Sequence, residues 1–144
     1  LSLARAAIKQ AGLDEVQFIP AGQPWQRAKL KASPQDRAAM VRLAIGNQPG
    51  FRLNTIEIER QGPTYTVETL RALPPGPEYY WILGADQLEN FCTWSDWETI
   101  ARMVTLLVAI FIAIYGRDIE CVGEIPVPFF TFIAILFTSG LDVL

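Results

Sequence analysis

The stretch GPTYTVETL at residues 62–70, followed by YYWILGAD at residues 79–86, indicates the fold of this chain. The first stretch reads as a loop that leads into a helix, with Thr64 as the expected N-cap. The second is a short apolar run, typical of a strand covered on both faces, that ends on a glycine and a carboxylate. A helix followed by a buried strand is the repeating unit of a parallel sheet.

Helices and strands alternate on both sides of these stretches. Gly12 ends an opening helix, and Ser33 followed by Pro34 marks the start of another. Helices are expected at residues 1–11, 33–45, 66–73 and 95–103, and strands at residues 16–19, 53–60, 79–83 and 104–108. Residues 1–108 therefore predict a partial α/β domain, with a mostly parallel sheet and helices on both faces.

Three local patterns predict which side chains are buried or act as caps. Alternation of apolar and polar residues at 53–60 predicts a strand near a sheet edge, with Glu57 and Glu59 facing outward. The residues Ser95 to Glu98 predict a capping box at a helix start. The helix that follows Ser33 is expected to bury its apolar residues, which are Met40, Val41, Leu43, Ala44 and Ile45.

Composition excludes several classes of protein. A chain of 144 residues is long enough for one core, and 12 basic against 15 acidic residues argue against a general nucleic-acid binder. The chain has no histidine, so neither a Ser-His-Asp triad nor a Cys/His zinc site can be built. Cys92 and Cys121 lack metal-binding spacing and are expected to be buried thiols of a reducing, cytoplasmic compartment. No metal ligands are expected.

The last quarter of the chain differs in character from the rest. Residues 109–115 and 125–141 are rich in Ile, Phe and Ala and contain no charged residue. A membrane hairpin is disfavoured, because a spanning helix needs about 20 apolar residues and the longer run carries Pro126 and Pro128. We expect residues 109–144 to be a hydrophobic tail whose fold the sequence does not determine. The tail would be made either of buried strands or of sequence foreign to the domain.

Glycines follow several of the expected strands. Gly22, Gly62 and Gly84 fall at or near strand ends, and Asp86 comes two residues after Gly84. Ligands of parallel sheets bind at the carboxyl ends of the strands, so these positions predict a binding site.

Several motifs in this order resemble the bacterial nicotinate-nucleotide adenylyltransferases of the Rossmann-like nucleotidylyltransferase superfamily. The motifs are LDEVQFIP at 13–20, residues 33–45 with Arg37 and Met40, EIER at 57–60, GPTYTVETL at 62–70, WILGAD at 81–86 and FCTW at 91–94. The resemblance covers residues 1–108, about three quarters of the chain, and implies the Rossmann-like nucleotidylyltransferase fold.

The resemblance implies adenylyl transfer from ATP to nicotinate mononucleotide, a step of NAD biosynthesis, with Mg²⁺ accompanying ATP. Catalysis would rest on positioning and charge stabilisation, without a covalent enzyme intermediate. The expected partners are these two small molecules, with neither nucleic acid nor membrane, and the sequence leaves a homo-oligomer open.

The resemblance also assigns roles in a substrate pocket. Trp94 would stack on the nicotinate ring, and Asp86 would accept hydrogen bonds from a ribose. Gly84 would allow close backbone approach, and Arg27 would meet phosphate. The other expected pocket residues are Tyr65 and Thr66, which shape the pocket, and Val67 and Ser95, whose nearby backbone amides would take the nicotinate carboxylate.

Each role has a structural alternative. Trp94 could be a core aromatic that packs on Trp97, and Asp86 could cap the turn that follows it. Tyr65 could simply pack at a helix start, and Arg27 could belong to a solvated loop with Lys29 and Lys31.

Two departures from the family pattern weigh on activity. The glycine-rich N-terminal loop with its histidine pair has no counterpart, as if the first strand and loop were missing. The arginine-containing phosphate segment near the C-terminus is absent too, and a frame-shifted or spliced tail would explain this. We therefore identify no catalytic residue and expect the chain alone to be impaired. The alternatives are a non-catalytic nucleotide-binding fragment or another nucleotidylyltransferase of the superfamily.

Overall fold

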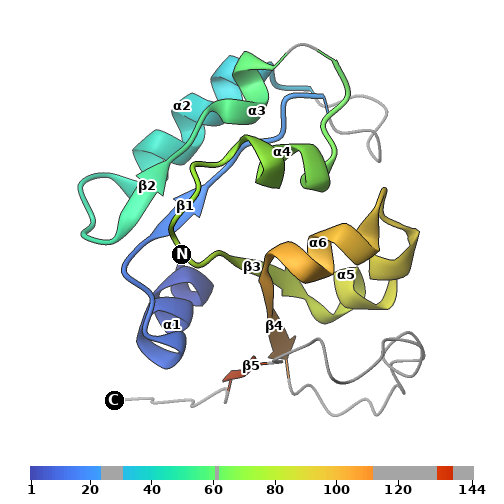
Figure 1. Cartoon of the computed structure of the whole chain (residues 1–144). Coiled ribbons are helices and arrows are strands. Elements are labelled where there is room, and N and C mark those ends of the chain that lie inside the picture. Colours follow the sequence, from blue (N-terminus) through green and yellow to red (C-terminus); the bar gives the residue numbers. More distant parts are fainter. Residues whose placement is uncertain (24–30, 61, 112–132, 138–144) are drawn as a thin grey trace, which may run out of the picture. The chain divides into compact units, whose positions relative to one another are not determined.

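The computed structural model describes residues 1–23, 31–60, 62–111 and 133–137 (Figure 1). The chain divides into two compact units, residues 1–76 and residues 77–144. Every strand pair in the described part of the chain is parallel. The parallel α/β arrangement that the alternation predicts is therefore confirmed.

The first unit contains a two-stranded parallel sheet with helices around it. Its elements are α1 (Ser2–Ala11), β1 (Val16–Phe18), α2 (Pro34–Ile45), β2 (Phe51–Leu53), α3 (Ile56–Glu59) and α4 (Thr66–Ala72). Val16 pairs with Phe51 and Phe18 with Leu53, and the rings of Phe18 and Phe51 meet edge to face at 5.3 Å. Buried apolar side chains fill this unit, among them Ala4, Ala7, Val16, Ala38, Ile45, Val67 and Leu70.

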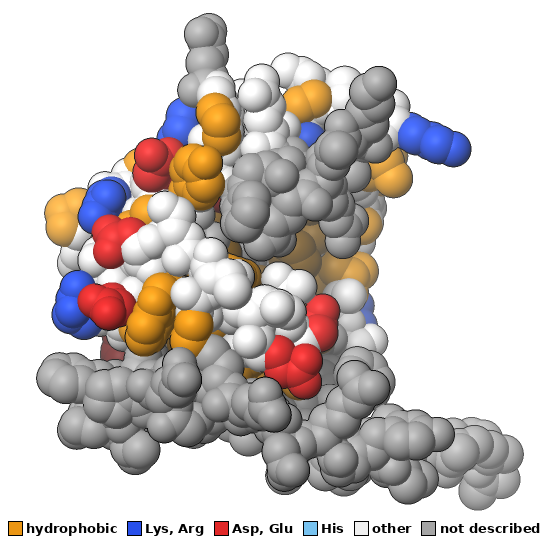
Figure 2. All heavy atoms as spheres, turned by 90° about the vertical axis from the view of Figure 1, so that its right-hand side faces the viewer, with side chains coloured by type: hydrophobic (Ala, Val, Ile, Leu, Met, Phe, Trp, Pro, Cys, Tyr) orange, Lys and Arg blue, Asp and Glu red, His pale blue; other side chains and the backbone are white. Residues whose placement is uncertain are grey.

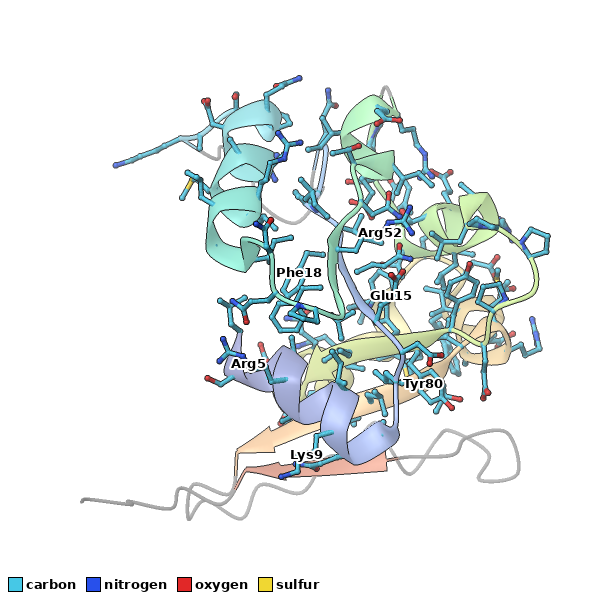
Figure 3. The ribbon with its side chains drawn as sticks, turned by 90° about the vertical axis from the view of Figure 1, so that its left-hand side faces the viewer. Arg5, Lys9, Glu15, Phe18, Arg52 and Tyr80 are labelled. Carbon is cyan, nitrogen blue, oxygen red and sulfur yellow. The ribbon has the colours of Figure 1, made fainter. Side chains whose placement is uncertain are left out.

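Helix α1 is amphipathic. Ala4 and Ala7 are buried, whereas Arg5 and Lys9 are exposed (Figure 3). The guanidinium of Arg5 donates to the Gln48 side chain at 2.7 and 3.2 Å, which ties the helix to the turn before β2. Gly12 ends the helix in the left-handed conformation with φ of 65°, as a C-terminal glycine commonly does.

The second unit contains a three-stranded parallel sheet in the order β3-β4-β5. Its elements are β3 (Tyr80–Gly84), α5 (Ala85–Glu89), the 3₁₀ helix η1 (Phe91–Thr93), α6 (Trp97–Met103), β4 (Thr105–Phe111) and β5 (Ile133–Phe137). Phe91, Ile100, Leu106 and Leu107 are almost completely buried and form the centre of this unit. The composition change near residue 108 falls inside β4, which continues to Phe111.

Residues 53–60 do not form the predicted strand. Strand β2 ends at Leu53, and Ile56–Glu59 form the short helix α3. Asn54 causes the change of direction: its backbone N–H donates to the Phe18 carbonyl at 2.9 Å, and its side-chain oxygen accepts the Ile56 N–H at 3.0 Å. Glu59 is exposed as expected, but Glu57 is buried at 7 % exposure, so its predicted outward orientation is wrong.

The buried face of α2 also differs from the prediction. Ala38 and Ile45 are buried and Val41 is half-buried, whereas Met40 and Leu43 are 63 % and 84 % exposed. Ala44 is exposed as well. Successive helical residues point about 100° apart. For this reason, the apolar run at positions 43–45 cannot face the core with all its side chains.

Of the three predicted caps, only Ser33 takes its place. Its hydroxyl oxygen accepts the Asp36 N–H at 3.0 Å at the start of α2. Helix α4 has Tyr65 rather than Thr64 at its N-cap, because the Thr64 N–H is tied to the Gln23 carbonyl at 3.2 Å. Helix α6 has Asp96 at its N-cap, since a turn from Trp94 to Trp97 places Ser95 one residue too early.

Candidate functional site

In the first unit, the loop after β1 meets the stretch 62–70. The Gln23 carbonyl accepts the Thr64 N–H, and the Gly22 carbonyl accepts a guanidinium N–H of Arg37 at 3.0 Å. A Cβ on Gly22 would overlap the backbone carbonyl of Glu57, so only glycine allows this approach. The loop is therefore tied to α2, α3 and the segment before α4.

Tyr65, Thr66 and Val67 lie next to one another where α4 begins. Val67 is buried at 3 % exposure and belongs to the core of the unit, whereas Tyr65 and Thr66 are half-buried. Tyr65 and Thr66 thus expose part of their side chains beside the loop, as pocket residues would.

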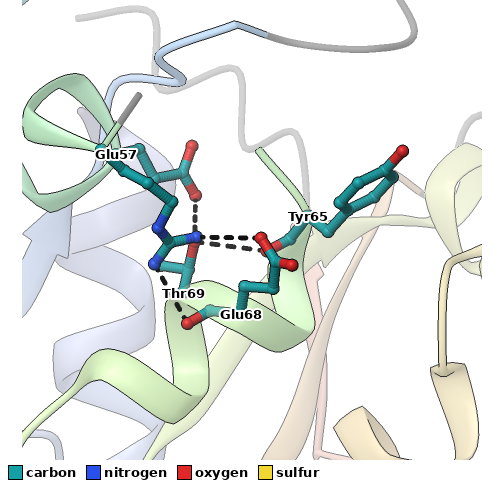
Figure 4. A network of polar contacts seen from close by, with 5 residues as sticks. Glu57, Tyr65, Glu68 and Thr69 are labelled. Carbon is teal, nitrogen blue, oxygen red and sulfur yellow. Dashed lines mark hydrogen bonds and ion pairs between the residues drawn. The ribbon is translucent and has the colours of Figure 1, made fainter. Parts of the chain in front are cut away.

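A buried polar network supports this segment from below (Figure 4). Glu57 accepts the Thr69 hydroxyl at 2.7 Å, and the same hydroxyl lies 3.4 Å from the Tyr65 carbonyl. Arg60 lies 3.5 Å from the Glu68 carboxylate and donates to the Glu68 carbonyl at 3.1 Å. Burial raises the pKa of Glu57, and the Thr69 hydroxyl, the Arg60 charge and the Gly22 N–H oppose this shift without cancelling it.

The alternating pattern at 53–60 does not predict this network. It predicts Glu57 as an exposed strand residue, whereas Glu57 lies in α3 and is buried. Asn54 at the end of β2 was the available signal, because asparagine commonly initiates a turn through its own side chain.

In the second unit, Gly84 and Asp86 lie at the carboxyl end of β3. Gly84 is the N-cap of α5 and Asp86 occupies its first turn. A Cβ on Gly84 would come within 2.5 Å of the Asp86 Oδ1 atom, so the carboxylate folds back over the glycine. Asp86 is exposed, which leaves its carboxylate accessible at a position where parallel sheets bind ligands.

Trp94 follows η1 and lies against Phe91. The two rings are 5.5 Å apart, and Phe91 also contacts Trp97 at 6.1 Å. Trp94 is half-buried, and its indole N–H is buried with no hydrogen-bond partner among the described residues. Buried indole N–H groups usually have a partner, so this one marks a place where an acceptor is missing.

The remaining predicted positions carry less structural information. Ser95 is exposed, and Arg27 lies outside the described residues. Tyr65, Thr66 and Val67 belong to the first unit, while Gly84, Asp86, Trp94 and Ser95 belong to the second.

Cys92 differs from the prediction of a buried thiol. It is half-buried and disulfide-bonded, so the prediction is wrong for this residue. Sequence spacing does not reveal which parts of a chain the fold brings near a cysteine. Cys121 lies outside the described residues.

Two further findings concern metals and membranes. Within residues 1–23, 31–60, 62–111 and 133–137, no group of three or more His, Cys, Asp or Glu side chains could hold a metal ion. None of the helices in these ranges is long and apolar enough to cross a bilayer.

On the face shown in Figure 2, the described Lys and Arg side chains are scattered and do not gather into a patch.

Comparison with known proteins places this geometry in a family. The model of the cytidylyltransferase-like family matches residues 1–136. The chain belongs to the cytidylyltransferase-like family. Its Rossmann-type fold, predicted from the alternation and the motifs, is thereby confirmed.

Curated proteins with similar sequences are named as probable nicotinate-nucleotide adenylyltransferases. A probable nicotinate-nucleotide adenylyltransferase of Bordetella avium is 59 % identical over 109 residues, which cover 76 % of this chain and 55 % of that protein. One of Methylibium petroleiphilum is 40 % identical over 131 residues, covering 89 % of this chain and 57 % of that protein. The chain thus spans about half the length of the curated relatives that it matches.

Solved structures support the same fold for this cytidylyltransferase-like chain. Nicotinic acid mononucleotide adenylyltransferase of Plasmodium falciparum, complexed with NaAD, superposes with a TM-score of 0.68 at 15 % identity. The superposition covers 92 % of this chain and 66 % of that one. A second structure of that enzyme, complexed with APC, gives a TM-score of 0.63 at 17 % identity.

Proposed function

We propose that this chain carries the substrate pocket of a nicotinate-nucleotide adenylyltransferase. The proposal rests on the 59 % identity with a relative of that name and on one structural observation. This observation is the half-buried indole of Trp94, which lies against the ring of Phe91 and whose N–H has no partner within the part of the chain that the structure describes. A flat ring would stack on the exposed part of such a tryptophan.

The reaction is a direct phosphoryl substitution. The 5'-phosphate oxygen of nicotinate mononucleotide attacks the α-phosphorus of ATP, and the bond to pyrophosphate breaks. The product is nicotinate adenine dinucleotide, a precursor of NAD, and the setting is the cytoplasm. Because no protein nucleophile is needed, catalysis is positioning and charge stabilisation.

The described side chains have complementary parts in this proposal. Trp94 stacks on the nicotinate ring, and Asp86 binds a ribose hydroxyl beside Gly84. By resemblance to the family alone, Tyr65 and Thr66 are assigned to shaping the pocket, and backbone amides near Val67 and Ser95 to binding the nicotinate carboxylate. Arg27 is assigned to phosphate from the sequence alone.

Magnesium enters only as a companion of ATP. The phosphates of ATP would provide its ligands. Magnesium would supply neutralisation of charge on the leaving pyrophosphate, and no step is assigned to a protein-bound ion.

Binding of nicotinate mononucleotide tests the pocket. We expect saturable quenching of tryptophan fluorescence that disappears in Trp94→Phe and persists in the control Trp97→Phe, since both tryptophans contact Phe91. Truncation in Trp94→Ala should weaken binding about tenfold, the size of one aromatic contact with its burial. Equal quenching in the chain and in Trp94→Phe would contradict the assignment of Trp94.

Turnover tests the reaction separately. Incubation with ATP and nicotinate mononucleotide, with Asp86→Asn as background, would reveal dinucleotide formation. Because the chain alone is expected to be impaired, binding without turnover fits both this proposal and the alternative of a non-catalytic nucleotide-binding fragment, whereas turnover above this background would exclude that alternative. Failure to bind this nucleotide, together with binding of another nucleotide or of phosphopantetheine, would favour a different nucleotidylyltransferase.

A further inference from the structure

Glu57 is an unusual residue for the interior of so small a unit. Its residue exposure is 7 %, yet it carries a carboxyl group that would be better solvated at the surface. The polar groups around it belong to different elements: Thr69 to α4, Gly22 to the loop after β1, and Arg60 to the end of α3. A buried carboxylate with polar partners from separate elements connects those elements to each other.

The connection to the loop after β1 is close. The space beside the Gly22 Cα is occupied by the Glu57 backbone carbonyl, and the Gly22 N–H acts to lower the pKa of the Glu57 carboxyl group. Side chain and backbone of Glu57 thus both fix the path of the chain at Gly22. The next residue, Gln23, holds the Thr64 N–H through its carbonyl.

The connection to α4 runs through one hydroxyl group. Thr69 is completely buried, donates to Glu57 at 2.7 Å, and lies one helical turn after Tyr65, whose carbonyl is 3.4 Å away. Arg60 adds two contacts to Glu68 on the exposed side of the same turn. Figure 4 shows the Tyr65 ring pointing away from this network, so the network holds the backbone of Tyr65 and leaves its ring outside.

We propose that Glu57 is a positioning residue, which holds the loop after β1 and the first turn of α4 in one arrangement and thereby shapes the pocket segment Tyr65–Thr66–Val67. The role in the pocket rests on the proposed function. Glu57 is buried, and it acts on the pocket segment through Gly22 and Thr69.

Two pairs of variants isolate this role. Glu57→Gln removes one of the two acceptor oxygens, and Glu59→Gln makes the same change at an exposed position of the same helix. Thr69→Val removes the hydroxyl while keeping the shape of the side chain, and Thr69→Ser keeps the hydroxyl. All four are compared by circular dichroism to establish that they fold.

The first readout needs no ligand. Amide hydrogen exchange, followed by NMR, should accelerate about tenfold or more at two amides. These are the amide of Gly22 in Glu57→Gln and the amide of residue 69 in Thr69→Val. Amides of α1 should keep their rates, as should all amides of Glu59→Gln and Thr69→Ser. Unchanged exchange at both positions would overturn the proposal whether or not any nucleotide binds.

The second readout is the affinity for nicotinate mononucleotide. Glu57→Gln and Thr69→Val should bind about tenfold more weakly, while Thr69→Ser and Glu59→Gln should bind like the unmodified chain. Full affinity with accelerated exchange would mean that Glu57 serves the fold alone, which also overturns the proposal. If the unmodified chain does not bind, the proposed function fails, and exchange alone decides whether Glu57 holds the two segments.

Discussion

At the scale of single residues, burial of one carboxyl group has a consequence for stability. Desolvation raises the pKa of Glu57 above its ordinary value near 4.5. At pH values between the ordinary pKa and the raised pKa of the folded state, the folded chain retains a proton on Glu57 that the unfolded chain releases. Folding stability from this group is therefore present at low pH and is lost as the pH rises through the folded-state pKa.

Glu57→Gln should remove this dependence. The difference in free energy of unfolding between the chain and this variant should shrink as the pH rises from 4.5, because only the chain loses stability there. Urea unfolding at a series of pH values measures the difference. Glu59→Gln serves as the control, and an identical pH profile for both variants would contradict the assignment of the buried charge.

The sequence alone could not place Glu57. Ile56, Glu57, Ile58 and Glu59 alternate as a strand would, and only the contacts of Asn54 with Phe18 and Ile56 turn this segment into a helix. Trp94 and Asp86, by contrast, could be singled out from their motifs, because their position after a strand that ends in glycine is a local property. Their partners, such as Phe91 for Trp94, are a matter of packing.

At the scale of elements, helix starts depend on the turn that precedes them. Ser33 and Ser95 both precede apolar helical runs, yet only Ser33 accepts a backbone N–H at a helix start. Pro34 fixes the backbone of the first turn of α2, which makes that cap predictable from sequence. The start of α6 depends on the turn after η1, which sequence patterns do not specify.

Ser33→Ala should therefore cost about 1 kcal/mol of stability, the usual loss for an N-cap. Ser95→Ala is the matched control and should change stability little, because Ser95 is exposed and lies before the N-cap. Chemical unfolding followed by circular dichroism at 222 nm compares the two variants. Equal losses would contradict the cap assignment.

At the scale of the whole molecule, the chain has two compact units. Ala7, Val67 and Leu70 are buried in the first, and Phe91 and Leu107 in the second. The parallel order of the strands followed from the alternation of elements. The division after Gly76 did not, since it depends on which elements pack together, and a separate tail at 109–144 stays a prediction.

Leu107→Ala should separate the two units in an unfolding experiment. Leu107 is fully buried on the central strand of the second sheet, so its truncation should cost about 2–5 kcal/mol. Three of the four tryptophans, Trp81, Trp94 and Trp97, lie in this unit. Fluorescence of the Trp25→Phe variant, in which only these three remain, should therefore show a lower unfolding midpoint than circular dichroism, which also reports α1 and α2.

Leu43→Ala is the control for this substitution, because Leu43 is 84 % exposed and its truncation should leave both midpoints nearly unchanged. Coincident shifts of both signals in Leu107→Ala would mean that the two units unfold as one cooperative body.

The contact at Gly22 limits how this sequence can evolve. The Glu57 carbonyl fills the place that a Cβ would take, and every other amino acid carries a Cβ. Substitution of Gly22 by another residue is therefore excluded as long as the backbone of α3 keeps its path. A lineage that replaced this glycine would first need a change in the backbone near residues 54–57. Gly22 and the segment around Glu57 are therefore expected to change together in evolution.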